Sequence, residues 1–369
     1  MRRPGPLAIL IALVAAIAPP ATATPVEPAV EPAVVVTTSA DGKPDDGAVT
    51  VAAVQFEVSE ARLRSLAEVR AQIDGLVRRA ARRYEADVVV FPEYLNVFLL
   101  ATRYPEAVGR ADDLYAALSG IAASTARADA VDAPAAPATP RRVLLEQADW
   151  IAEQTLAMWS AIADRHDVVV VAGTLFAPAG DGRFATATRS DTELRNRLLV
   201  FDPDGELVYT QDKVYLTPVE ADVLGLEPGR LADAAPVVVD GVEIGFTICR
   251  DTFFDSWAAR LGGVDLWIDL RANGEPYSEE VYRRFLGTLP ERVATTDASA
   301  GLNASLTGEF LGHVWAGPSY AVAADGARIA ASDSPVGTQI TALRLTRRGR
   351  NWIPVPVSLG DAGGPTGTR

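Results

Sequence analysis

The stretch DVVVFPEY, residues 87–94, contains a continuous apolar run that ends in a proline and a glutamate. A run of this length, in which apolar residues do not alternate with polar ones, is typical of a strand that is covered on both faces. Glu93 lies just past the end of the run, where the chain would leave the sheet. The stretch therefore predicts a strand buried between other layers of the protein, with a carboxylate at its end.

Strands and helices are predicted to alternate on both sides of this stretch. Residues 50–58 form a predicted strand, and apolar residues spaced by three and four along residues 59–84 predict a helix. Further along we expect helices at 141–165 and near 277–300, strands at 167–176 and 264–270, and hairpins with Asp-Gly turns at 197–213, 236–249 and 319–332. This order predicts an α/β fold in which helices cover mixed sheets, with residues 101–140 as an insertion in a surface loop.

The two ends of the chain differ from the predicted folded part. Residues 1–23 begin with two arginines, continue with an apolar run and end in small residues, which is the layout of a secretory signal peptide. The apolar run is shorter than the roughly 20 residues that a membrane-spanning helix needs. We therefore expect a secreted or periplasmic protein with no membrane insertion in its mature form. Membrane anchoring by an uncleaved signal is the minor alternative.

Composition divides the rest of the chain and excludes several classes of function. Residues 24–48 are predicted to be a disordered leader, residues 49–346 the folded domain, and residues 347–369 a C-terminal tail. The formal net charge of −14 argues against binding to nucleic acid or to anionic membranes. One cysteine and two histidines, His166 and His313, cannot form a typical zinc site, so no metal is expected.

Three segments carry residues that can act together in catalysis. Glu93 ends the first stretch, QDKVYLTPVE contains Lys213 and Glu220, and FTICRDTFF contains the one cysteine of the chain, Cys249. Loops at one edge of a sheet lie close together, so these side chains can converge. A lone buried cysteine is more often a small apolar filler. However, exported proteins normally pair their cysteines, and an unpaired thiol with a carboxylate and an ammonium nearby indicates a nucleophile.

Lysine is scarce in this chain. Only two of its 34 basic Lys and Arg residues are lysines, and one of them, Lys43, lies in the predicted leader. A genome that favours arginine codons would explain the scarcity but not the location of Lys213 in the predicted domain. Arginine is bulkier and presents a planar fork instead of a compact ammonium, so the two are not interchangeable in a tight site. The location of Lys213 therefore indicates a functional role.

These segments resemble those of the nitrilase superfamily of carbon–nitrogen hydrolases, from about residue 50 to residue 332. In that family a glutamate in a strand-end FPE, a lysine before an HLxP-like segment, and a cysteine followed by an aromatic and an acidic residue form the active site. The matching residues here are Glu93, Lys213 and Cys249, in the family's order. Glu220 matches a second glutamate that usually follows the lysine by seven or eight residues.

The resemblance implies a nitrilase-like α-β-β-α sandwich and a thiol hydrolase that needs no cofactor. The expected substrate is a small amide or a related compound with a non-peptide carbon–nitrogen bond, and a homodimer or higher homo-oligomer is expected. Glu93 would take the thiol proton and pass it to the leaving amine, while Lys213 would stabilise the oxyanion. Glu220 would orient Lys213 or the substrate, with Asp222 as the alternative.

The residues after the cysteine depart in part from the family pattern. Arg250 replaces the common aromatic residue, which affects the expected substrate pocket and not the mechanism. Asp251 matches the acidic position and is expected to tie the loop. Arg250, or Arg271 in DLRANGEPY, is a candidate partner for a substrate carboxylate.

Two other classes of function are considered. A papain-like cysteine protease would use Cys249 and His313, but the usual flanking residues and disulfides are missing. A binding protein that kept the sandwich and lost its chemistry would not need Glu93, Lys213 and Cys249 together. We expect His166 to lie at the surface or at a helix end.

Overall fold

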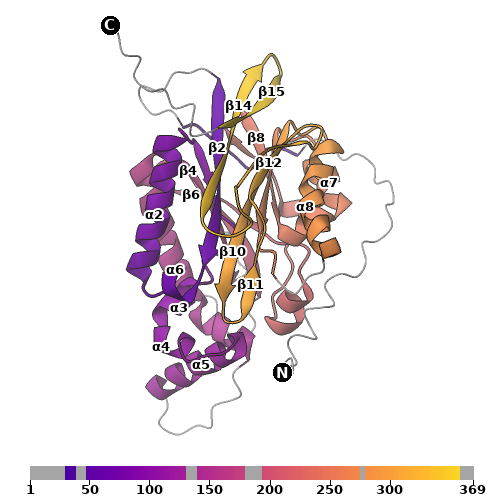
Figure 1. Ribbon diagram of the computed structural model, residues 1–369. Helices are drawn as coiled ribbons and strands as arrows, with labels where there is room; N and C mark the ends of the chain where they lie inside the picture. Colours follow the sequence, from indigo (N-terminus) through magenta and orange to yellow (C-terminus); the bar gives the residue numbers. More distant parts are fainter. Residues whose placement is uncertain (1–29, 39–46, 130–138, 179–192, 275–278, 358–369) are drawn as a thin grey trace.

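The computed structural model describes residues 30–38, 47–129, 139–178, 193–274 and 279–357. In these residues two sheets pack face to face, and helices cover the outer face of each sheet (Figure 1). The α-β-β-α sandwich predicted from the sequence is confirmed. The predicted signal peptide lies outside the described residues. None of the helices within the described ranges is both long enough and apolar enough to cross a membrane.

The strands form one hydrogen-bonded network that divides into two sheets. The first sheet contains β2 (Ala48–Val58), β3 (Val88–Val90), β4 (Val169–Pro178), β5 (Leu194–Phe201), β6 (Leu207–Asp212), β14 (Gln339–Arg348) and β15 (Asn351–Val357). The second contains β1 (Val34–Val36), β7 (Val237–Val239), β8 (Val242–Ile248), β9 (Leu266–Arg271), β10 (Ala300–Phe310), β12 (Tyr320–Ala323) and β13 (Arg328–Ala331). The end of β10 also pairs with β2 and with β11 (His313–Trp315), so this strand joins the two sheets.

Helices cover the two sheets on opposite sides of the sandwich (Figure 1). The first sheet is covered by α2 (Leu66–Arg83) and α6 (Pro140–His166), and the second by α7 (Asp255–Leu261) and α8 (Glu279–Ala294). The predicted helix over 59–84 starts later, at Leu66, because the Ser65 side chain caps it by accepting a hydrogen bond from the Glu68 N–H at 3.2 Å.

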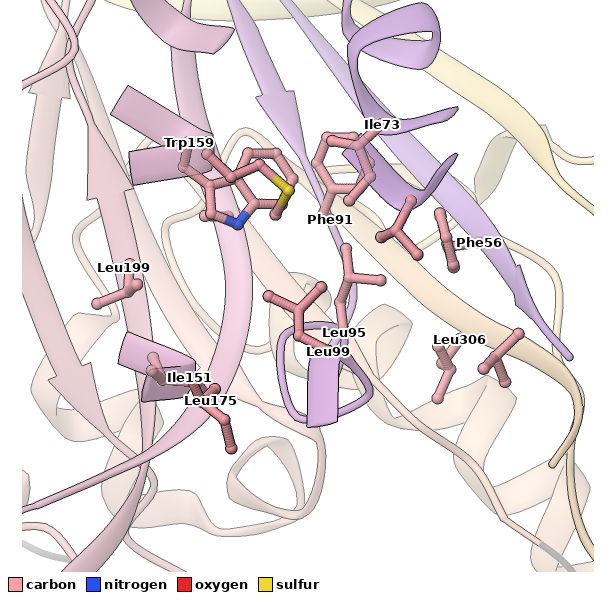
Figure 2. Close-up of a cluster of buried hydrophobic side chains, with 14 of the residues drawn as sticks. Phe56, Ile73, Phe91, Leu95, Leu99, Ile151, Trp159, Leu175, Leu199 and Leu306 are labelled. Atoms are coloured by element: carbon pink, nitrogen blue, oxygen red, sulfur yellow. The ribbon is translucent and has the colours of Figure 1, made fainter. Parts of the chain in front are cut away.

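The valines of β3 are buried on both sides, as the sequence predicted. Val88 and Val90 belong to the apolar cluster between the two sheets, whereas Val89 belongs to the cluster under α2 and α6. Figure 2 shows this second cluster, in which the Phe91 ring lies against Trp159 with ring centroids 4.8 Å apart. β3 is shorter than the predicted stretch of residues 87–94 because Pro92 has no N–H with which to continue the ladder.

The predicted surface insertion at 101–140 is wrong for its first part. The chain there forms α3 (Leu99–Arg103), α4 (Pro105–Val108) and α5 (Leu114–Asp129). Ala117, Leu118, Ile121 and Ala122 of α5 are buried in the cluster under α2 and α6, at the spacing of one helical face. Residues 130–138 lie outside the described residues.

Three further predictions about boundaries need correction. β1 lies inside the predicted disordered leader and pairs in parallel with β7. The prediction of disorder is therefore wrong for residues 34–36. The predicted start of the tail at 347 falls inside β14, and the folded chain continues to the end of β15. The predicted helix near 277–300 ends at Ala294, and β10 follows it. The sequence did not predict β10, because polar residues interrupt the apolar run that is typical of a buried strand.

Candidate active site

Glu93, Lys213 and Glu220 meet in the interior of the protein. Glu93 follows β3, Lys213 directly follows β6, and Glu220 lies in a short π-helical turn, Val219–Val223. The Lys213 Nζ lies 2.7 Å from Glu93 Oε1 and 2.8 Å from Glu220 Oε2, and at most 1% of each of these side chains is exposed. The structure thus places one ammonium between two carboxylates, out of contact with water.

Two further groups hold the carboxylates in place. Asn196 of β5 donates from Nδ2 to Glu93 Oε1 and to Glu220 Oε1, both at 2.9 Å. The backbone N–H of Thr217 donates to Glu220 Oε2 at 2.8 Å. Glu220, and not the alternative Asp222, is therefore the carboxylate beside Lys213, because Glu220 contacts Lys213 whereas Asp222 is exposed.

Cys249 stands at the end of β8, where the chain turns into a 3-10 helix, Cys249–Phe253. Its backbone φ of +51° lies in the left-handed region, and 6% of the residue is exposed. The backbone N–H of Ala272 forms a hydrogen bond to the thiol, and the charges of Glu93 and Lys213 act on it. The turn thus directs the sulfur toward the same interior site as the carboxylate and the ammonium.

Burial and charge set the protonation of these groups. Burial raises the pKa of Glu93 to about 7, against the opposing effect of the Lys213 ammonium. Burial acts to lower the pKa of Lys213, but the Glu220 and Glu93 carboxylates outweigh it and raise this pKa. Burial likewise acts to raise the pKa of Glu220, but Lys213 outweighs it and lowers this pKa. At neutral pH the site thus holds an ammonium, the Glu220 carboxylate, and Glu93 near its point of half-protonation.

The thiol and one carboxylate oxygen remain available for proton transfer. Burial, and then the charge of Glu93, raise the pKa of Cys249, so the thiol is protonated at neutral pH and needs a base. Within the described part of the chain, Glu93 Oε2 is buried and has no hydrogen-bond partner. Because Oε1 is occupied by Lys213 and Asn196, Oε2 is the oxygen of Glu93 that is free to take a proton.

The fold agrees with the comparisons with known proteins. The family model described as carbon-nitrogen hydrolase matches residues 50–350. The chain belongs to this family. It is therefore a member of the nitrilase superfamily, an enzyme class that hydrolyses carbon–nitrogen bonds other than peptide bonds. No curated protein sequence matches the chain.

Solved structures of carbon–nitrogen hydrolases share the fold. A mutant of the Nesterenkonia AN1 amidase from the nitrilase superfamily is 17% identical, with a TM-score of 0.54, over 80% of this chain and 90% of the amidase chain. A second mutant of that amidase, with acrylamide added to its active-site cysteine, gives the same identity and TM-score over 85% of this chain and 96% of its own. The carbon-nitrogen hydrolase from Helicobacter pylori G27 is 15% identical, with a TM-score of 0.56, over 80% of this chain and 89% of its own.

Asp251 and Arg250 secure the loop that carries Lys213 in this hydrolase. Asp251 accepts hydrogen bonds from the backbone N–H groups of Val214 and Tyr215, the latter at 2.8 Å, as expected of a residue that ties the loop. Burial raises the pKa of Asp251 to about 7. Arg250 donates to the Leu216 carbonyl at 2.9 Å, so it acts on the same loop. These contacts explain how two loops distant in sequence keep a fixed spacing.

The sequence analysis missed two residues of the site. Asn196 bridges both carboxylates, and its signal was a polar side chain inside an otherwise apolar strand. Tyr94 has φ +66°, its ring centroid lies 5.7 Å from Lys213 Nζ, and its side chain forms a hydrogen bond with Glu220. Its position directly after Glu93 was the available signal.

The remaining candidates lie outside the cluster of Glu93, Lys213, Glu220 and Cys249. His166 is the last residue of α6 and lies 3.0 Å from Asp74, in accord with the predicted helix end. The His313 ring lies against Trp315, and burial lowers its pKa. The Arg271 charge is matched by Asp269. The part of the chain that the structure describes contains no group of three or more His, Cys, Asp and Glu side chains able to hold a metal ion.

Proposed function

We propose that this carbon–nitrogen hydrolase is an exported amidase that cleaves a small amide through a Cys249 acyl-enzyme, with Glu93 as acid and base and Lys213 as oxyanion stabiliser. The observation that carries this proposal is the buried Lys213 ammonium, 2.7 Å from a Glu93 carboxylate whose second oxygen is unpaired within the described residues. Most buried carboxylate oxygens have a hydrogen-bond partner, so one that lacks a partner beside a buried ammonium is a candidate for proton transfer.

In the acylation step, Glu93 Oε2 takes the proton of the Cys249 thiol while the sulfur forms a bond to the amide carbon. The carbonyl π electrons move to oxygen, and the Lys213 ammonium and the backbone N–H that follows Cys249 stabilise this oxyanion. When the carbonyl re-forms, the carbon–nitrogen bond breaks and Glu93 gives its proton to the departing nitrogen. Ammonia or an amine leaves, and a thioester remains on Cys249.

In the deacylation step, Glu93 takes a proton from a water molecule, whose oxygen attacks the thioester carbon. A second oxyanion forms at the same position and collapses with cleavage of the carbon–sulfur bond. The sulfur leaves as a thiolate and recovers the proton from Glu93, while the carboxylic acid departs. A group with a pKa of about 7 suits this cycle, because it both accepts and releases a proton at neutral pH.

The amide class of substrate is supported by the solved amidase that shares the fold, a mutant of which is in complex with butyramide. Nitriles and carbamoyl compounds are the other substrates that the same chemistry accommodates. A panel of short amides, nitriles and carbamoyl compounds, with ammonia release and intact-mass measurement, tests the proposal. We expect ammonia release and a covalent adduct on wild-type Cys249, and neither with Cys249→Ala. If no compound is hydrolysed and none forms an adduct with Cys249, the amidase proposal is wrong and a binding function is the alternative that remains.

The surroundings of His313 give no support to the protease alternative. The His313 ring lies against Trp315, and its pKa is lowered by burial and raised in part by the charge of Asp113. Substitutions separate the two functions. For an amidase of this kind we expect His313→Ala to retain activity and Glu93→Gln to lose it. A protease would show the opposite pattern.

Export is supported by the composition of residues 1–23, with two arginines before an apolar run and small residues after it. N-terminal sequencing of the protein recovered from the periplasm or the medium tests this part. We expect a chain that starts near residue 24. Full-length protein found only in the cytoplasm would refute export and leave the chemistry unaffected.

A further inference from the structure

A buried carboxylate and a buried guanidinium lie in β9, beside the strand that ends at Cys249. Asp269 pairs in register with Thr247 of β8 and with Asn303 of β10, and Arg271 pairs in register with Ser305. At most 2% of each side chain is exposed. An acidic residue inside a fully buried strand has a large desolvation cost, which is offset only by specific partners.

Arg271 is anchored on three elements of the second sheet and its helix layer. Its guanidinium forms an ion pair with the Asp269 carboxylate and donates to the Phe285 carbonyl of α8. It also lies over the Tyr320 ring of β12, 5.7 Å from the ring centroid. These contacts fix the direction from which the guanidinium meets Asp269.

Asp269 in turn lies against the turn that carries the nucleophile. Asp269 stands opposite Thr247, two residues before Cys249, and the Cys249 backbone N–H and the Thr252 side chain lower its pKa against the effect of burial. Thr252 is held further by the Thr247 hydroxyl at 2.7 Å and by Arg292, which donates to the Thr252 carbonyl at 3.0 Å. One carboxylate therefore interacts electrostatically with the first and the fourth residue of the 3-10 turn.

The turn needs such support because Cys249 has a backbone conformation that residues with a side chain rarely adopt. A φ of +51° costs of order 1 kcal/mol or more for a residue other than glycine, and it persists only where the surroundings enforce it. In this conformation Cys249 interacts electrostatically with Asp269 as well as with Glu93 and Lys213.

We propose that Asp269, held by Arg271, is a positioning residue for the nucleophile: its carboxylate fixes the left-handed turn at Cys249 and thereby aims the sulfur at the substrate carbon. This inference rests on the proposed thiol chemistry of Cys249. It assigns a role to two residues that do not contact the Glu93–Lys213–Glu220 cluster.

The variants Asp269→Asn and Asp269→Asn/Arg271→Gln test this proposal, with Asp255→Asn as a control for the loss of an Arg–Asp pair. Asp255 pairs with Arg292 at 2.5 Å, but 63% of its side chain is exposed and it lies beyond the turn. Three quantities are measured: kcat and KM on an amide, the midpoint of thermal unfolding, and the pH midpoint of Cys249 alkylation by iodoacetamide. The double variant leaves no unpaired buried charge, so it replaces Asp269→Asn if the single variant does not fold.

We expect Asp269→Asn to lower kcat about tenfold to a hundredfold with KM within threefold, because a misaimed nucleophile affects the chemical step. The alkylation midpoint moves to lower pH, since the negative charge of Asp269 acts to raise the pKa of the thiol. The double variant recovers the thermal stability lost in the single variant but not kcat. Asp255→Asn retains wild-type kcat and alkylation.

A kcat of Asp269→Asn within twofold of wild type would overturn the inference. Recovery of kcat together with stability in the double variant would also overturn it, because the pair would then serve packing alone. If the wild type hydrolyses no amide, the proposed function is wrong. The role of Asp269 is then tested by the pH midpoint of Cys249 alkylation alone. A lower alkylation midpoint in Asp269→Asn then supports the contact with Cys249, and an unchanged midpoint refutes it.

Discussion

Replacing Lys213 by methionine removes the one positive charge that lies between Glu93 and Glu220. Lys213 Nζ contacts both carboxylates within 2.8 Å, and no water reaches them. Without the ammonium, neither of the two buried carboxylates, both held 2.9 Å from the same Asn196 nitrogen, has a positive charge to pair with, so Glu220 as well as Glu93 must take a proton on folding. The variant therefore exchanges an ion triad for a pair of carboxylic acids.

The cost of this change depends on pH. Protonating a carboxyl group with an ordinary pKa of 4.5 costs about 3 kcal/mol at pH 7 and about 1 kcal/mol at pH 5. Removing one partner of a buried ion pair typically costs about 3–5 kcal/mol. The value of about 3 kcal/mol at pH 7 lies at the lower end of this range. The sign follows from the lowered pKa of Glu220 in the wild type, which contributes stability above pH 4.5 that is lost as the pH falls.

Urea denaturation of wild type and Lys213→Met at pH 5, 7 and 8 measures this cost. We expect a loss of about 3 kcal/mol in the free energy of unfolding at pH 7, which shrinks toward pH 5, and a loss of activity of about 10²–10³ from the missing oxyanion partner. Lys213→Arg is the control that keeps the charge. Because it keeps the positive charge, Lys213→Arg should show no pH-dependent loss of stability. Its activity should still be low, because the planar guanidinium does not fit the position of a compact ammonium. A loss below about 1 kcal/mol at all three pH values would refute the buried triad.

Four further outcomes are expected. The activity of wild type rises as the pH increases through about 7, where Glu93 loses its proton and becomes a base; a pH–rate profile that is flat from 5 to 8 would contradict this role. Asp251→Asn loses about 1–3 kcal/mol of stability in a denaturation experiment, because one N–H of the Lys213 loop loses its acceptor. Gly173→Ala fails to fold or melts far lower, since a Cβ there would lie 2.3 Å from the Pro92 carbonyl at a φ of +72°. Sedimentation velocity shows a homodimer or a larger assembly, and a monomer at every concentration would refute that expectation.

The local structure of this protein follows closely from its sequence. The valines of residues 88–90, the Asp-Gly turns and the spacing of apolar residues along α2 predicted strands, hairpins and a helix that the structure contains. Strands buried on both faces need unbroken apolar runs, so that pattern indicated a sandwich covered by helices. Where polar side chains interrupt the pattern, as Asn303 and Ser305 do in β10, the strand could not be recognised from the sequence, because their hydrogen-bond partners, Tyr320 and Pro318, lie on a later segment of the chain.

The sequence by itself determined which groups are present for chemistry: one thiol, one lysine in the folded domain, and a carboxylate at the end of a buried strand. Only the tertiary structure decided that Glu220 and not Asp222 faces Lys213, that Asn196 and Tyr94 complete the site, and that Asp269 lies under the Cys249 turn. The physical reason is that the protonation of these side chains and the direction in which they point depend on burial and on neighbours more than 100 positions away along the chain. Spacing within a sequence does not carry that information, whereas the packing of two sheets does.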